Sequence, residues 1–153
     1  MISLKDIENI QKEWGDSLVK LGSLKNNRVA CEKEVELLIN KLYGYKSGTV
    51  LFKPTKAKDD QFRLTFEGAK SYFIGENSNF SEDKGFALQP WTNVRFENAS
   101  VILKKDSAIA MGNYFLVKRF NISVVFNYII LSIFFCHPTS SNSAEVFCNI
   151  KSI

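Results

Sequence analysis

The chain opens with apolar residues spaced as on one face of a helix. They recur at intervals of three and four positions and are Ile7, Ile10, Trp14, Leu18 and Leu21. Ser3 and Asp6 resemble a capping box, and Gly22 is a suitable stop. The pattern therefore predicts a first helix that begins at Ser3 and ends near Gly22.

A second helix is predicted after the polar turn Lys25 to Asn27. Its apolar stripe consists of Cys31, Val35, Leu38 and Leu42. The helix is expected to run from about Asn27 to Tyr43, with Gly44 ending it. We expect both stripes, including Trp14, to pack in the core.

The pattern then changes to that of extended chain. Residues 49–53 are rich in β-branched and aromatic side chains, as in a strand, and Pro54 cuts this run. Residues 66–75 follow and are predicted to contain a short helix, on which Phe66, Ala69 and Phe73 share one side. A polar loop is predicted for residues 76–85.

Two long strands are predicted next, joined by a tight turn. They cover 92–104 and 107–117, where apolar and polar residues alternate. The alternation shifts along the first strand, which suggests a bulge near Asn98. Helices followed by an antiparallel sheet indicate an α+β fold, with the helices gathered on one face of a curved sheet.

The charges are mixed and nearly balanced. There are 20 Lys and Arg against 16 Asp and Glu, a net charge of +4, so we expect no nucleic-acid partner. The densest basic stretch is Lys53, Lys56 and Lys58. It is followed at once by Asp59 and Asp60, which we expect to cancel most of its charge and to be solvated turn residues rather than a Mg²⁺ site.

Simple counts exclude a zinc site built from several histidines and argue against a disulfide framework. His137 is the only histidine, whereas zinc prefers four nitrogen or sulfur ligands. Three cysteines are scattered along the chain without a C-x-x-C pair. We therefore expect no metal and no cofactor, and thiols that fit a reducing compartment.

The last 33 residues differ in composition from the rest. Beyond residue 120, only Glu145 and Lys151 are charged. The uncharged run 121–136 is too short and too interrupted for a spanning helix, and the amino terminus lacks a secretory signal, so we expect no membrane association and a cytoplasmic location. One hypothesis is that this tail arises from a gene-model fault. A spliced transcript encoding the same tail would reject it.

Motifs for nucleotide binding or for a serine hydrolase elbow are absent from the sequence. What remains is a set of hydroxyl groups in apolar surroundings, carried by Thr55, Tyr72 and Tyr114. A buried hydroxyl needs a partner, so each could be structural or could line a cavity that binds a small polar molecule. From the residues alone, the prediction stops at an α+β domain with a candidate pocket.

Several strings, taken together and in order, resemble a known family. They are Leu51 to Ala57 (LFKPTKA), Gln61 to Arg63 (QFR), Glu67 to Phe73 (EGAKSYF), Asp83 to Leu88 (DKGFAL), Pro90 to Ala99 (PWTNVRFENA) and Ala110 to Phe115 (AMGNYF). This combination is similar to the iota-class carbonic anhydrases, which are SnoaL-like proteins with the nuclear transport factor 2-like cone fold. The resemblance covers about residues 5 to 116.

The resemblance implies a fold and an association state. Residues 1–120 would form the cone domain, with N-terminal helices packed on a curved antiparallel sheet. Residues 121–153 would be an atypical segment that can complete the sheet. Cones of this kind commonly pair through their sheets, so a homodimer is expected.

The resemblance also implies a function. Members of the family interconvert CO₂ and bicarbonate, some without a metal, and here Thr55 and Tyr72 would hold the bicarbonate oxygens and the water. Arg63 is a candidate for a charge-assisted contact to the anion, and Tyr114 for substrate binding. His137 and Thr139 can be aligned with a family His and Ser, although Pro138 between them is foreign to a strand interior.

Two other functions remain open at this stage. A SnoaL-like isomerase or cyclase would use an acidic or histidine base deep in the cone, for which Glu67 is a candidate. A non-catalytic small-molecule binding or dimerisation domain is the alternative outside enzymes. A pocket filled by Phe side chains would favour that reading.

Overall fold

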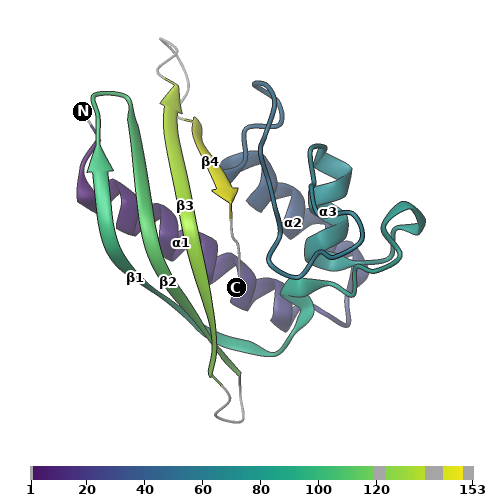
Figure 1. Cartoon of the computed structure of the whole chain (residues 1–153). Helices are drawn as coiled ribbons and strands as arrows, with labels where there is room; N and C mark the ends of the chain where they lie inside the picture. Colours follow the sequence, from purple (N-terminus) through teal and green to yellow (C-terminus); the bar gives the residue numbers. More distant parts are fainter. Residues whose placement is uncertain (1, 119–122, 137–142, 150–153) are drawn as a thin grey trace.

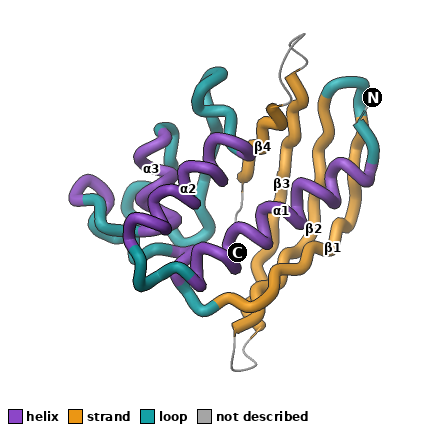
Figure 2. Tube along the Cα trace, turned by 180° about the vertical axis from the view of Figure 1, so that it is seen from behind, coloured by secondary structure: helices purple, strands orange, loops and turns teal. Residues whose placement is uncertain are grey.

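A long helix lies across one face of a four-stranded antiparallel sheet (Figure 1). This computed structural model describes residues 2–118, 123–136 and 143–149. The helices are α1 (Leu4–Ser23), α2 (Arg28–Leu42) and α3 (Phe66–Ile74), and the strands are β1 (Trp91–Leu103), β2 (Ser107–Lys118), β3 (Ser123–Cys136) and β4 (Ser143–Asn149). Figure 2 shows the molecule from behind. In this view α1 runs in front of the sheet, and α2 and α3 lie together to the left of the strands.

The first predicted helix is confirmed, including its start. Ser3 is the N-cap of α1, and the Ser3 and Asp6 side chains form the reciprocal capping box. Every residue of the predicted apolar stripe is buried, and α1 contacts β1 through it. The stripe therefore builds the layer of core between helix and sheet.

The second predicted helix is confirmed as well. The Asn27 side chain accepts a hydrogen bond from the Ala30 backbone N–H and caps α2, and the four stripe residues are buried. α2 contacts α1, α3 and β4. The short helix predicted within 66–75 is α3, which Thr65 caps and which ends at Ile74.

The strand-like segment 49–53 does not form a strand. Val50 and Phe52 are buried as its composition suggests, but only Lys53 takes part in a single bridge. The Phe52 carbonyl accepts a hydrogen bond from the Arg63 N–H at 2.9 Å. Pro54 has no N–H to continue such pairing, and the chain turns away there.

The two predicted strands are confirmed as β1 and β2, and so is the bulge between them. Their register shifts between Asn98 and Ser100. Gln11 on α1 exchanges two side-chain hydrogen bonds with Asn98, at 2.8 and 3.0 Å. This pair ties the helix to the bulge and sets where α1 crosses the sheet.

Strands β3 and β4 come from the segment beyond residue 120, in which charged residues are few. They extend the same sheet in the order β1-β2-β3-β4, and each pairs antiparallel with its neighbour. The α+β prediction, with helices on one face of an antiparallel sheet, is confirmed. Among the residues that the structure describes, no helix is long and apolar enough to cross a membrane.

Gly112 is required where the bulge brings two strands close together. A Cβ on Gly112 would stand 2.0 Å from the Glu97 carbonyl oxygen and 2.9 Å from the Ala99 nitrogen. We expect Gly112→Ala to lower the free energy of unfolding by about 3 kcal/mol, since backbone must move to admit the methyl group. Gly48→Ala, with no atom within 4 Å of its Cβ, is the control and should change stability by less than about 0.5 kcal/mol in urea denaturation. Equal losses in both variants would contradict this reading.

Candidate active site

A cavity of about 800 Å³ opens between α3 and two loops. One loop follows Pro54, and the other leads from residue 81 to the start of β1. Most of its lining residues carry a polar or charged group, and the lining consists of Lys53, Thr55, Lys56, Ala57, Lys58, Gln61, Tyr72, Glu82, Asp83, Lys84, Gly85, Phe86 and Gln89. Two of the predicted site residues, Thr55 and Tyr72, therefore face the same space.

Tyr114 supports Thr55 from the sheet. The Thr55 Oγ1 and Tyr114 Oη atoms lie 2.9 Å apart and share a hydrogen bond. Tyr114 is 1% exposed on β2, and its ring packs against those of Trp14 and Phe96 at 5.7 and 5.8 Å. Tyr114 is thus fixed behind the cavity lining and holds the Thr55 hydroxyl in place.

Tyr72 reaches the cavity from α3. Its ring stacks on Phe86 with centroids 5.1 Å apart and meets Phe52 edge-on at 5.7 Å. Gly85 has φ +74°, a left-handed conformation that favours glycine, and it turns the chain just before Phe86. The turn places an aromatic face beside the Tyr72 ring.

Arg63 does not line the cavity, contrary to its predicted contact with the anion. Its side chain is fully buried, and its Nη2 donates to Asp83 at 2.9 Å and to Glu82 at 3.3 Å. The Phe80 ring lies 4.4 Å from the guanidinium carbon. The Asp60 carboxylate adds a third negative charge, 3.7 Å from Nη1. Because these carboxylates compensate the charge of Arg63, its side chain holds the two loops together and does not contact a substrate in the cavity.

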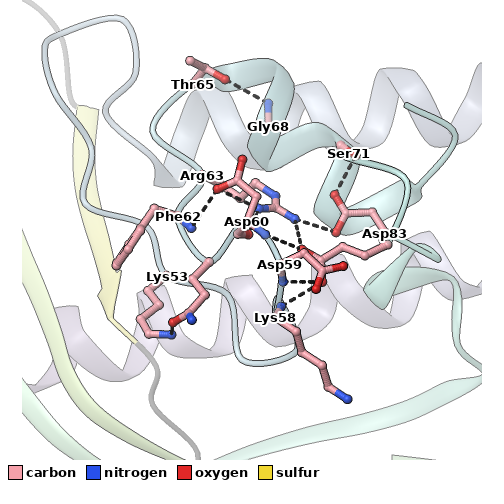
Figure 3. A network of polar contacts seen from close by, with 12 residues as sticks. Lys53, Lys58, Asp59, Asp60, Phe62, Arg63, Thr65, Gly68, Ser71 and Asp83 are labelled. Atoms are coloured by element: carbon pink, nitrogen blue, oxygen red, sulfur yellow. Dashed lines mark hydrogen bonds and ion pairs between the residues drawn. The ribbon is translucent and has the colours of Figure 1, made fainter. Parts of the chain in front are cut away.

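The hydrogen bonds and ion pairs around Arg63 join α3 to both loops of the cavity. Figure 3 shows Arg63 between Asp60 and Asp83, with Ser71 of α3 bonded to Asp83. The Ser71 hydroxyl donates to Asp83 at 2.6 Å, and Arg63 also donates to the Asp60 carbonyl. The cavity walls are therefore fixed to one another by buried polar contacts.

Glu82 binds the loop that carries Thr55. Its carboxylate accepts hydrogen bonds from the backbone N–H groups of Lys58, Asp59 and Asp60, at 2.8, 3.3 and 3.1 Å. Burial by itself would raise the pKa of Glu82, but these N–H groups and Arg63 outweigh it and lower the pKa to about 2.

The low pKa of Glu82 predicts a loss of stability in acid. A carboxyl group whose pKa falls on folding stabilises the native state above the unfolded pKa. We expect this stabilisation to be complete above pH about 4.5 and to disappear as the pH falls toward 2. Urea denaturation of the wild type and Glu82→Gln across this range measures it. The difference in free energy of unfolding between wild type and Glu82→Gln should become smaller as the pH falls. A difference that does not depend on pH would contradict the lowered pKa of Glu82.

Three other predicted residues have different outcomes. Glu67 lies exposed in the first turn of α3, so it is not the internal base of an isomerase. His137 and Thr139 lie outside the described residues, and their assignment stays a prediction. Within the part of the chain that the structure describes, no group of three or more His, Cys, Asp or Glu side chains is arranged to hold a metal ion.

The sequence did not reveal the lysines of the cavity as site residues. The sequence shows Lys53, Lys56 and Lys58 as a basic stretch whose charge Asp59 and Asp60 are predicted to cancel. In the structure the three lysines line the cavity, whereas neither aspartate belongs to the lining. Neighbours in sequence point in different directions on a loop, so the local balance of charge differs from the balance along the chain.

Comparison with known proteins places the chain in a family. The family model described as metal-independent carbonic anhydrase matches residues 5–133. A curated relative, the metal-independent carbonic anhydrase of Nostoc sp. (strain PCC 7120 / SAG 25.82 / UTEX 2576), is 36% identical over 121 residues, which are 77% of this chain. The chain spans 59% of the length of that relative.

Solved structures agree with this assignment. The crystal structure of a cyanobacterial iota-carbonic anhydrase complexed with bicarbonate matches with a TM-score of 0.90 at 28% identity, over 98% of this chain and 92% of that one. A putative calcium/calmodulin-dependent protein kinase II association domain from Xanthomonas campestris matches with a TM-score of 0.58 at 14% identity, over 100% of this chain and 89% of that one, and shares the fold. The resemblance inferred from the sequence strings is thus confirmed, and the chain belongs to the metal-independent carbonic anhydrase family.

Proposed function

We propose that this chain interconverts CO₂ and bicarbonate in the cavity lined by Thr55 and Tyr72, without a metal. Family membership supports the reaction, and bicarbonate is bound by the similar iota-carbonic anhydrase. The observation that supports the site best is that Thr55 and Tyr72 line one cavity. These are the two residues to which the family resemblance assigns the bicarbonate oxygens and the water.

Hydroxyl groups carry the proposed chemistry. In hydration the water oxygen adds to the carbon of CO₂, one C–O π bond opens, and the electron pair moves onto oxygen while a proton leaves to the buffer. Donors aimed at that oxygen stabilise the charge as it develops. When Tyr114 donates to Thr55, the Thr55 proton is free to point into the cavity, where Tyr72 supplies a second hydroxyl.

The walls of the cavity suit both forms of the substrate. CO₂ is uncharged and apolar, and the stacked rings of Tyr72 and Phe86 offer it an apolar surface. Bicarbonate is an anion, and Lys53, just before Pro54, together with Lys56 and Lys58 from the loop after it, favours the anion electrostatically. The product is therefore stabilised by groups that have little interaction with CO₂.

Stopped-flow CO₂ hydration tests the proposal. Purified protein should accelerate the acidification of a weakly buffered indicator solution, and a chelator such as EDTA should leave the rate unchanged. A rate equal to that of buffer alone would reject the activity. A rate abolished by the chelator and restored by a divalent cation would reject the metal-free mechanism.

The exposed face of the sheet supports pairing of two copies of this chain. Ile102 and Ile109 are cross-strand partners, and both are exposed, as is Met111 further along β2. Apolar side chains grouped on one sheet face are typical of an association surface. We expect wild type to be a dimer in analytical ultracentrifugation and Ile109→Lys/Met111→Lys to be a monomer. A dimer that persists in this variant would place the contact elsewhere.

A further inference from the structure

The lining of the cavity carries more lysines than carboxylates. Four lysines line it, together with the carboxylates Glu82 and Asp83. Both carboxylates are bound by the buried Arg63, and Glu82 also accepts three backbone N–H groups. Their charge is therefore largely compensated behind the cavity wall, whereas the lysines belong to the wall itself.

Two ammonium groups lie over neighbouring aromatic rings at one side of this cavity. The ring of Phe86 stacks on Tyr72 and lies 6.0 Å from Trp91, so the three rings form a row. Lys56 Nζ is 5.9 Å from the centroid of Phe86, and Lys118 Nζ is 5.1 Å from that of Trp91. The faces of adjacent rings thus attract two cations to adjacent positions.

A polar side chain of the cavity lining contacts the second lysine. Lys118 Nζ donates to Gln89 Oε1 at 3.4 Å, and Gln89 lines the same cavity as Lys56. Partial burial lowers the pKa of Lys56, and the charge of Lys118 lowers it further. The two ammonium groups therefore repel one another, and an anion placed between them would relieve the repulsion.

We propose that Lys56 and Lys118, with the side-chain amide of Gln89, form a second anion site beside the Thr55–Tyr72 pocket. The site would accept a small planar oxyanion with the size and charge of bicarbonate. Uncharged CO₂ has no comparable attraction to ammonium groups, so the site distinguishes the charged form of the substrate from the neutral one. It would receive bicarbonate as it leaves or enters the pocket, a role that rests on the proposed function.

Nitrate is a suitable probe, because it is a planar oxyanion that cannot react. In protein labelled with ¹³C at lysine Cε, NMR titration reports the ionisation of Lys56 directly. We expect nitrate to raise the pKa of Lys56 in the wild type and to do so with saturation. An unchanged Lys56 titration at high nitrate would overturn the proposal, and this measurement needs no variant.

Variants locate the site. Lys118→Gln should raise the pKa of Lys56 in the absence of anion and weaken nitrate binding about tenfold or more. Lys33→Gln, which removes one charge from the exposed side of α2, controls for net charge and should leave nitrate binding within about twofold. If Lys84→Gln weakened nitrate binding as much as Lys118→Gln, the cavity would attract anions diffusely, and the two-lysine site would be rejected.

These outcomes separate the site from the activity. A chain that binds nitrate at Lys56 but does not hydrate CO₂ would refute the proposed function and leave the anion site standing. A chain that hydrates CO₂ while nitrate leaves Lys56 unaffected would refute the site alone.

Discussion

Tyr72→Phe and Thr55→Val are each expected to lower kcat/KM for CO₂ hydration by about 100-fold, equivalent to about 2.7 kcal/mol of transition-state stabilisation. Each change removes one hydroxyl from the cavity and keeps nearly the same side-chain volume. The loss is large because a fixed donor in a partly buried site stabilises developing charge without reorganising. Thr55→Val also leaves the Tyr114 hydroxyl, 1% exposed, without its 2.9 Å partner.

Matched controls separate chemistry from folding. Tyr45→Phe removes a hydroxyl that donates to the Arg63 carbonyl at 2.6 Å, and Thr92→Val removes one that donates to the Val117 carbonyl at 3.2 Å. Neither residue lines the cavity. Stopped-flow rates of the controls should stay within about threefold of wild type. Site variants as active as these controls would remove Thr55 and Tyr72 from the mechanism.

The second large effect is expected on stability, from removal of the carboxylate that pairs with Arg63. Asp83→Ala should lower the free energy of unfolding by about 3–5 kcal/mol, because it leaves a fully buried guanidinium short of charge compensation. The Ser71 hydroxyl would lose its 2.6 Å acceptor as well. Urea denaturation at neutral pH measures the change.

An exposed ion pair provides the comparison. Lys12 and Asp16 are 73% and 66% exposed, so Asp16→Ala should cost less than about 1 kcal/mol. Asp83→Asn keeps an oxygen acceptor in place and should lose less stability than Asp83→Ala. If the alanine variant does not fold, the free energy of unfolding of Asp83→Asn still tests the prediction. A loss for Asp83→Ala no greater than that for Asp16→Ala would show that Glu82 and Asp60 compensate Arg63 without Asp83.

Much of the secondary structure followed from local patterns. The capping box at Ser3, the Asn27 cap and the apolar stripes of α1 and α2 were read correctly, because each depends on residues within one or two helical turns. The bulge at Asn98 was recognised from the shift in alternation. Residues 49–53 were misread as strand-like, since a strand needs a partner and composition does not supply one.

The candidate site was predictable only in part. Thr55, Tyr72 and Tyr114 were selected one by one, from hydroxyl chemistry and family resemblance. Their arrangement is non-local: the Thr55–Tyr114 hydrogen bond joins residues 59 positions apart. Arg63 was assigned to the anion because an arginine near the motif suits that role, yet its partner Asp83, 20 positions away, turns it into part of the framework.

By itself, the sequence determined which segments form the α-helices and that the fold is α+β, because these follow from periodicity and capping. Its composition also determined that several imidazoles cannot surround a zinc ion. Only the tertiary structure decided which side chains share the cavity. It placed Thr55 and Tyr72 in one lining, buried Arg63 behind it, and put Lys56 and Lys118 over adjacent rings. The physical reason is that charge compensation and hydroxyl pairing depend on distances in space, whereas the order of residues along the chain sets only local geometry.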